Sequence, residues 1–221
     1  MFEASKIEKM ADISTKQKIL NASIRLFNEN GLANVRLQQI ADETGISVGN
    51  LAYHFRNKEA IVSAVNENLN DDIKEILSAY RLFPNLIDFD NQLSKYFSFL
   101  EKYPFYFLDL LEMERAYPEV KAHCQQYITK MISQIRKRFD FNQQRGLFIK
   151  EPYPGIYDVL ADSIWVLMSF WMPQRLIRNE EPHCEGRFKQ MAWSQLFPYF
   201  TEKGKEEYDQ LIRPMLNQHF S

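Results

Sequence analysis

The sequence has few of the residues that interrupt helices or cross-link chains, and each shortage excludes a class of protein. Only seven glycines and two cysteines occur among 221 residues, and Cys124 and Cys184 provide no disulfide framework. No stretch approaches the roughly 20 apolar residues of a membrane span. The N-terminal segment MFEASKIEKMADIS mixes charges and lacks the apolar core of a secretory signal peptide. We therefore expect a cytoplasmic protein with reduced cysteines and no membrane partner.

A strong charge of one sign is also missing. The formal net charge is −2, and residues 1–60 carry eight Lys and Arg against seven Asp and Glu. A protein that coats nucleic acid through a general basic field would carry a large positive charge. Any affinity for DNA must therefore come from a few individually placed contacts.

What the chain does contain is apolar sequence with helical periodicity. Hydrophobic residues make up 45% of the chain and aromatic residues 14%, which is enough for a sizeable core. Apolar residues recur with the 3.6-residue period of helices over long stretches, whereas β-branched runs that alternate with period two are absent. These features predict an all-α protein.

The segment from Leu37 to Phe55, LQQIADETGISVGNLAYHF, predicts two short helices joined by a tight turn. Gly45 ends the first helix and allows the left-handed backbone that a sharp turn needs. Ser47 is a natural N-cap for the second helix. The buried faces are predicted to carry Leu37, Ile40, Ala41, Ile46, Leu51 and Phe55. This arrangement is typical of a helix-turn-helix that presents its second helix to the major groove of DNA.

In this region the chain resembles the TetR/AcrR family of transcription regulators. The resemblance covers about the first 60 residues, through the ordered segments KQKILNASIRLFNENG, ANVRLQQIADETGIS, GNLAYHF and NKEAI. It implies a dimer that reads a palindromic DNA operator, and a divergent helical body that binds an inducer and dimerises through its last two long helices. The partners that it implies are double-stranded DNA, a small-molecule effector and a second copy of the chain.

Helix signals divide the rest of the chain. Ser14 and Gln17 have the spacing of a capping box at the start of the first helix, and Asn57 can cap a long helix from Lys58 to about Tyr80. Later helices are predicted at about 87–102, 105–116, 118–140, 155–178, 184–200 and 204–218. We expect an all-α fold: an N-terminal three-helix DNA-binding head with a helix-turn-helix (1–57), joined by a long helix to a helical ligand-binding and dimerisation body (58–221). Dimerisation is expected through the helices of about 155–178 and 184–200.

Nine residues are candidates for contacts with DNA. Asn50 can pair with an adenine edge or a phosphate, and Val48 can touch a thymine methyl group. Lys58 opens a helix whose N-terminus already favours an anion, which suits a phosphate contact. The alternative for each residue is an ordinary solvent-exposed position that makes no contact with DNA. The full candidate set is Arg36, Gln38, Ser47, Val48, Gly49, Asn50, Tyr53, His54 and Lys58.

Three residues depart from the family pattern. Lys or Arg is frequent where Val48 stands, and Tyr is frequent where Ala52 stands. Arg36 occupies a position that is usually a capping Ser or Thr, so Asn34 is the alternative cap. Because of these departures, the operator sequence cannot be inferred from the family. The mode of DNA binding can still be inferred from it.

The body is rich in aromatic residues around the Tyr103-Pro104 break and on the helix of Trp165. One reading is a cavity for an apolar or aromatic effector, in which a few polar groups fix the orientation of the ligand. The other is core packing, because aromatic residues at helical spacing more often belong to the core than to a ligand site. The candidate ligand-binding residues are Phe97, Tyr103, Phe107, Glu112, His123, Tyr127, Asp162 and Trp165.

Neither metal binding nor catalysis is indicated. The pairs His123-Cys124 and His183-Cys184 would have to converge in space, because adjacent residues on a helix diverge by about 100°. We see no nucleophile–base–acid arrangement and no phosphate-binding loop, so we expect no enzyme activity, no metal and no cofactor. The sequence favours a ligand-responsive repressor. The alternatives are an activator, a regulator without an effector, or a ligand-binding protein whose head has lost DNA binding.

Overall fold

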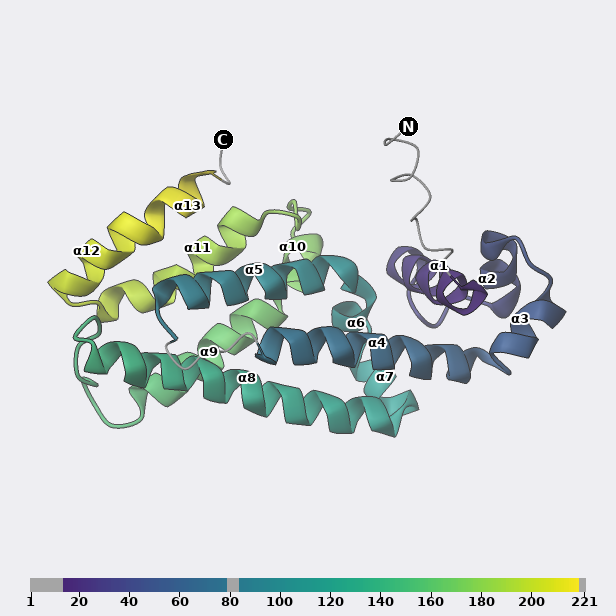
Figure 1. Ribbon diagram of the computed structural model, residues 1–221, viewed down its shortest axis with the longest axis horizontal. Coiled ribbons are helices and arrows are strands. Elements are labelled where there is room, and N and C mark those ends of the chain that lie inside the picture. Colours follow the sequence, from purple (N-terminus) through teal and green to yellow (C-terminus); the bar gives the residue numbers. More distant parts are fainter. Residues whose placement is uncertain (1–13, 79–83, 219–221) are drawn as a thin grey trace, which may run out of the picture. The chain divides into compact units, whose positions relative to one another are not determined.

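The computed structural model describes residues 14–78 and 84–218, which are almost entirely helical (Figure 1). Within these ranges there is no strand, only one isolated antiparallel bridge between Phe148 and Phe200. The all-α prediction is confirmed. No helix in the described ranges has the length and apolar character needed to span a membrane.

The chain forms two compact units that divide between Leu69 and Asn70. Unit 1 contains α1 (Thr15–Asn30), α2 (Leu37–Thr44), α3 (Val48–His54) and the first part of α4 (Lys58–Ser78). The division between the two units therefore falls inside α4. Described residues of α4 end at Ser78, and Tyr80 lies outside the described residues.

The ends of α1 follow the capping signals in the sequence. The Ser14 hydroxyl oxygen accepts from the backbone N–H of Gln17 at 3.2 Å, so Ser14 is the N-cap. In a full capping box the Gln17 side chain would also accept from the Ser14 backbone N–H. Here the Gln17 side chain instead donates to Asn21. Gly31 ends the helix with a positive φ of 76°.

The turn of the helix-turn-helix is formed as predicted. Gly45 has φ 68° and ψ 29°, and its N–H donates to the carbonyl of Asp42 at 3.1 Å. A Cβ atom at Gly45 would meet nothing within 4 Å, so the backbone angle and not the space requires glycine there. Ala41 is fully buried where α2 packs against its neighbours, and the Ser47 hydroxyl caps α3 by accepting from the Asn50 N–H.

The N-terminus of α2 differs from the expectation that Asn34 caps it. Arg36 occupies the N-cap position, and its backbone N–H donates to the side-chain oxygen of Gln39 at 2.7 Å. The Asn34 side chain instead donates to the carbonyl of Asn30, at the end of α1. Gln39 therefore satisfies the N–H of the N-cap residue, which is the second half of a capping box. The first half needs a side-chain oxygen at the N-cap, and a guanidinium group has no acceptor.

Unit 2 is a helical bundle. It contains the end of α4, then α5 (Leu86–Lys102), α6 (Pro104–Leu108), α7 (Leu110–Ala116), α8 (Pro118–Gln144), α9 (Ile156–Ser169), α10 (Trp171–Ile177), α11 (Glu185–Leu196), α12 (Glu202–Leu211) and α13 (Arg213–Gln218). The long α8 packs against α7 and α9, and α11 packs against both α9 and α5 (Figure 1). One apolar stripe of α8 is buried, from Val120 and Cys124 to Phe139.

Three predicted helices are each divided in two. The helix of 155–178 breaks at Phe170, because Pro173 has no N–H to donate to the Ser169 carbonyl and its ring crowds that carbonyl. The helix of 204–218 breaks at Ile212, just before Pro214, for the same reason. The helix of 105–116 breaks at Asp109, a residue type with weak helix propensity.

A buried polar cluster joins α5 to α11. The Lys189 ammonium donates to Asp90 at 2.8 Å, and the Trp193 indole N–H donates to the other oxygen of the same carboxylate at 3.0 Å. The side chains of Lys189 and Asp90 are 3% and 2% exposed. Glu185 is a second, more exposed acidic neighbour of Lys189, at 3.2 Å.

Candidate DNA-binding surface and effector pocket

The outer face of α3 is the most exposed feature of unit 1. Leu51 is fully buried and anchors the helix, whereas Gly49 and Asn50 face solvent. Tyr53 is 86% exposed and is the only large hydrophobic side chain that stands out in this way among the described residues of unit 1. Its ring meets that of His54 edge to face, at a centroid distance of 5.3 Å. An aromatic ring held in solvent beside Asn50 is suited to contact a sugar–phosphate backbone.

The structure brings the α3 candidates together on one short helix. Val48 and His54 are half-buried, and the hydroxyl of Ser47 is used to cap the helix. Arg36 and Gln38 are exposed at the start of α2, where the Gln38 amide donates to Asp42 at 2.7 Å.

Lys58 has a structural role that the sequence did not reveal. Its ammonium group donates to the carbonyl oxygens of Leu32 at 2.6 Å and Ala33 at 3.3 Å. These carbonyls lie in the loop between α1 and α2, so Lys58 ties that loop to the N-terminus of α4. Any phosphate contact made by Lys58 would be an addition to this role.

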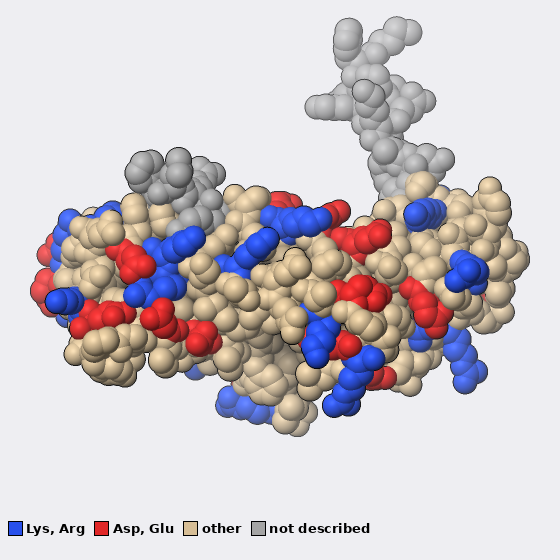
Figure 2. Space-filling model, turned by 90° about the horizontal axis from the view of Figure 1, so that it is seen from below, with Lys and Arg blue, Asp and Glu red and all other residues tan. Residues whose placement is uncertain are grey.

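Sequence reasoning overlooked Arg56. This exposed residue lies in the loop between α3 and α4, two positions after His54 and two before Lys58. A basic residue this close in sequence to α3 could have been included among the candidates for contacts with DNA. Basic and acidic side chains are interspersed on the face of the molecule shown in Figure 2, in keeping with the near-neutral net charge.

Unit 2 contains a pocket of about 650 Å³ between α6, α7, α8, α9 and α10. Four of the predicted ligand-binding residues line it: Phe107, Glu112, Tyr127 and Trp165. The Tyr127 and Trp165 rings meet edge to face in a T-shaped contact, with centroids 5.5 Å apart. Most of the lining is apolar, and its volume lies within the range of small-molecule sites.

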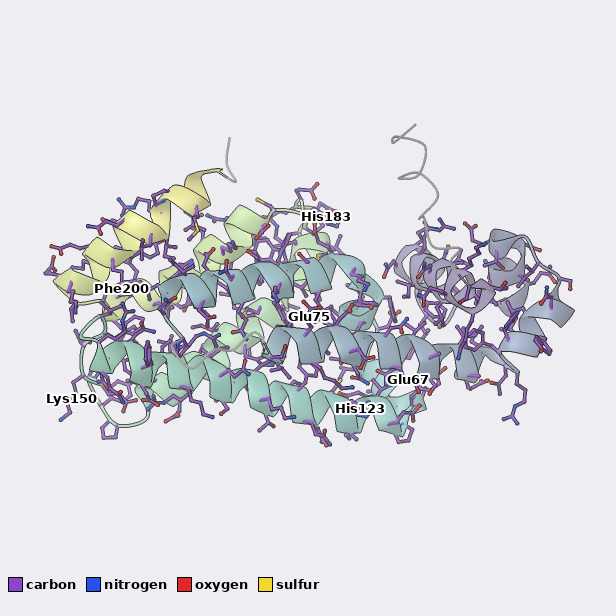
Figure 3. All side chains as sticks on the ribbon, viewed as in Figure 1. Glu67, Glu75, His123, Lys150, His183 and Phe200 are labelled. Atoms are coloured by element: carbon purple, nitrogen blue, oxygen red, sulfur yellow. The ribbon has the colours of Figure 1, made fainter. Side chains whose placement is uncertain are left out.

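The other four predicted residues lie outside this pocket. Phe97 packs in the core against Phe188, and the buried Tyr103 donates its hydroxyl to Asp72 on α4 at 2.9 Å. His123 is exposed on α8 and is hydrogen-bonded to Asn70 (Figure 3). Asp162 is exposed on α9.

Tyr127 and Ser169 line the pocket, and two further tyrosines close to them, Tyr96 and Tyr106, are buried in the core outside its lining. Burial raises the pKa of each of the three tyrosines well above its ordinary value. The Tyr106 hydroxyl and the Cys124 sulfur are 2.5 Å apart, and burial raises the pKa of this thiol to about 11. All these groups are therefore uncharged at neutral pH.

The two His-Cys pairs do not converge. His123 lies on α8 and His183 lies just before α11, at well-separated places in unit 2 (Figure 3). The His183 ring is instead 3.3 Å from Glu101. Among the described residues no group of three His, Cys, Asp or Glu side chains is placed to hold a metal ion.

Comparison with known proteins decides the family. The family profile described as "Bacterial regulatory proteins, tetR family" matches residues 19–65, and the TetR profile described as "Bacterial transcriptional repressor" matches residues 68–208. The chain belongs to the TetR family. The relatives that it matches are named as transcription regulators.

Individual relatives agree with this assignment. The icaADBC negative transcriptional regulator IcaR of Staphylococcus epidermidis is 28% identical over 193 residues, which cover 82% of this chain and 96% of IcaR. RutR of Escherichia coli is 40% identical over 70 residues, 31% of this chain and 33% of RutR. The regulator YerO of Bacillus subtilis is 44% identical over 52 residues, 24% of this chain and 18% of YerO. The chain thus spans a third or less of these last two relatives.

Solved structures share the fold. A TetR-family regulator from Marinobacter aquaeolei superposes with a TM-score of 0.78 at 24% identity, covering 93% of this chain and 98% of that one. The SmeT–triclosan complex superposes with a TM-score of 0.55 at 15% identity, covering 85% and 92%. At these identities the likeness shows the fold alone.

Proposed function

We propose that this TetR-family regulator is a cytoplasmic repressor that binds a palindromic operator as a homodimer and is released by a small apolar or aromatic effector. The observation that carries the proposal is the exposed face of α3. The turn at Gly45 and the Ser47 cap hold α3 against α2 so that this face lies in solvent. Family membership and the resemblance to a negative regulator over 96% of its length support repression. In this proposal residues 1–57 bind DNA and residues 58–221 bind the effector and form the dimer.

In the proposed complex α3 lies in the major groove. Asn50 reads a base edge, Val48 contacts a thymine methyl group, and Gly49 allows close approach of the backbone. Tyr53 packs on the sugar–phosphate backbone. The remaining contacts are assigned to backbone phosphates and come from Arg36, Gln38, Ser47, His54, Arg56 and Lys58.

The dimer is proposed to form on α9, with α10 and α11 beside it. Val159 and Val166 are 58% and 62% exposed on one face of α9, and Phe170 continues this face at its end. Ile177 on α10 is 76% exposed. A two-fold axis would place the same apolar face of a second copy against these residues and remove them from water. The exposed side chains of α11, such as Arg187 and Gln190, are polar and suit the rim of such an interface.

The effector is proposed to bind in the 650 Å³ pocket and to act through α4. Phe107 lines the pocket and packs against Phe99, which in turn packs against Tyr103. Tyr103 is hydrogen-bonded to Asp72 on α4, the helix that begins at Lys58 in unit 1. A ligand that favours one position of these rings would shift the equilibrium of α4 between two states and so change the operator affinity.

The test of the proposal is a gel shift with DNA from upstream of the protein's own gene. We expect a sequence-specific complex of two chains per site and a steep loss of affinity with added salt. Absence of any specific complex at low salt would contradict DNA binding. A reporter fused to the same promoter, assayed with and without the gene, distinguishes repression from activation.

A further inference from the structure

The pocket of unit 2 opens on the same face of α9 that we assign to the dimer, and we propose that the second copy of the chain closes this pocket. The effector then contacts both copies, and its binding strengthens the dimer. The inference rests on the proposed function, because it concerns the effector pocket and the dimer face named there. It adds that the two share residues and that the pocket is incomplete in a single copy.

The lining of the pocket divides into a buried floor and an exposed mouth. The floor is aromatic, since Phe107, Tyr127 and Trp165 line the pocket and are buried. Four other large hydrophobic side chains of the lining are exposed to solvent, and we call them the apolar mouth: Leu108, Leu111, Val166 and Phe170. A ligand on the floor of a single copy keeps one side in water, whereas small-molecule sites usually enclose most of their ligand. A further surface is therefore needed to complete the site.

The apolar mouth continues the face of α9 that we assign to the dimer. Val159, Val166 and Phe170 are seven and four positions apart, which places them within about 40° of one another around the helix axis. Val166 and Phe170 line the pocket, whereas Val159 does not. A surface that covers this face of α9 therefore also covers part of the mouth. Leu108 on α6 and Leu111 on α7 extend the same apolar surface across the opening.

The charges at the mouth favour a second copy as the occupant. Glu112 and Arg115 lie about one turn apart on α7, and both are exposed and line the pocket. Neither has an ion-pair partner in the part of the chain that the structure describes. A two-fold axis brings the same surface of a second copy against this one, so an acid and a base on that surface can each meet the opposite charge. The second copy thus offers apolar side chains to the mouth and a counter-charge to α7.

Closure by the second copy links effector binding to dimerisation. A ligand that contacts both copies has more contacts in the dimer than in the monomer, so it shifts the equilibrium towards the dimer. By the same linkage, dimerisation raises the affinity for the ligand by an equal factor. The effector-bound regulator therefore leaves the operator as a dimer, and release does not involve separation of the two copies.

The first test compares a monomeric variant with the wild type. The probe is N-phenyl-1-naphthylamine, an uncharged aromatic compound whose fluorescence rises in an apolar site, and it is titrated into the full-length protein. Val159→Glu is used because Val159 lies on the dimer face but does not line the pocket. The monomeric variant should bind the probe about tenfold more weakly than the wild type, within the usual range of coupling between sites. Ile87→Glu, at an exposed position of α5, is the matched control and should bind it as the wild type does.

Two more variants test the reciprocal effect and the place of binding. Val159→Ala trims the dimer face without adding a charge, and saturating probe should raise its association constant in sedimentation velocity by about tenfold for each occupied site. Ile128→Trp fills the pocket from α8, because Ile128 is half-buried in its lining. This variant should remain a dimer and lose the probe.

The outcomes distinguish this inference from the proposed function. Equal affinity of the probe for the wild type and for monomeric Val159→Glu would show that a single copy forms the whole site, and the inference would be wrong although the pocket and the dimer face stand. A probe that favours the monomer of Val159→Ala would contradict it in the same way. A monomeric wild type, or a Val159→Glu variant that remains a dimer, would refute the dimer face and the inference together. If the wild type does not bind the probe, or if Ile128→Trp binds it equally well, the effector pocket of the proposed function is wrong and this inference fails with it.

Discussion

Replacing Lys189 by Met should destabilise unit 2 strongly, because it leaves a buried carboxylate without its cation. Asp90 is 2% exposed and has two donors, the Lys189 ammonium at 2.8 Å and the Trp193 indole at 3.0 Å. Met is close to Lys in volume, so packing between α5 and α11 is largely retained. The remaining indole hydrogen bond cannot offset the desolvation of the carboxylate.

The expected loss is about 3–5 kcal/mol of unfolding free energy, the usual cost of removing one partner from a buried ion pair. This is a large share of the roughly 5–15 kcal/mol that stabilises a typical domain. Adding Asp90→Asn to Lys189→Met should recover part of the loss, because Asn still accepts from Trp193 but carries no charge. The pair is therefore expected to be strongly coupled in a double-mutant cycle.

Urea unfolding followed by circular dichroism measures these free energies. Lys205→Met is the matched control, since Lys205 pairs with Glu202 at 2.7 Å on the surface. That variant should change the unfolding free energy by about 0.5 kcal/mol or less. A loss below about 1 kcal/mol for Lys189→Met would refute the view that this buried pair holds α11 to α5.

Four further outcomes are expected. Asn50→Ala should cost about 1–3 kcal/mol per half-site and relax the preference at one base pair, as measured by gel shifts with operator variants. Val159→Glu should convert the dimer to monomers in sedimentation velocity, whereas Ile87→Glu, at an exposed position of α5, should not; a monomeric wild type would contradict the proposed interface. Gly204→Ala should cost about 3 kcal/mol in urea unfolding, because its Cβ would collide with the Leu147 backbone oxygen, and a neutral effect would show that α12 can shift. Stability should fall as pH rises above 10, since the unfolded chain then loses phenolic protons that the folded chain retains, and melting temperatures that stay constant to pH 12 would contradict the raised pKa of Tyr96, Tyr103, Tyr106, Tyr127 and Tyr157.

The helix-turn-helix could be predicted because its signals are local. Gly45 needs only its own backbone angle, and Ser47 caps a helix that begins at the next residue. The positions of buried and exposed residues along α3 follow from the helical period of 3.6 residues alone. The exception was the cap of α2, where Arg36 and not Asn34 occupies the N-cap position, and Gln39 accepts from the Arg36 backbone N–H.

The divided helices show where local reasoning was incomplete. Pro173 and Pro214 were present in the sequence, but each lies inside a longer apolar pattern that favoured a continuous helix. The missing N–H and the crowded carbonyl outweighed the pattern at Phe170 and Ile212. The break at Phe170 matters for the site, because this residue lines the pocket and ends the exposed face of α9.

The pocket of unit 2 was only half predictable from the sequence. Aromatic content indicated a cavity or a core, and the structure contains both. Phe107 and Trp165 line the pocket, whereas Phe97 packs in the core on the same kind of helical stripe. The choice depends on which helices meet there, and periodicity does not contain that information.

The sequence by itself determined the helical class and the helix-turn-helix, since both depend on interactions between residues close in the chain. It also determined the family, because the resemblance rests on short segments in a fixed order. Only the tertiary structure decided where distant side chains meet. It placed the Lys58 ammonium on carbonyls of the loop between α1 and α2, and it paired Lys189 with Asp90. Each of these depends on how helices pack in three dimensions, and the energy of a buried polar group is set by the atoms around it and not by its neighbours in the sequence.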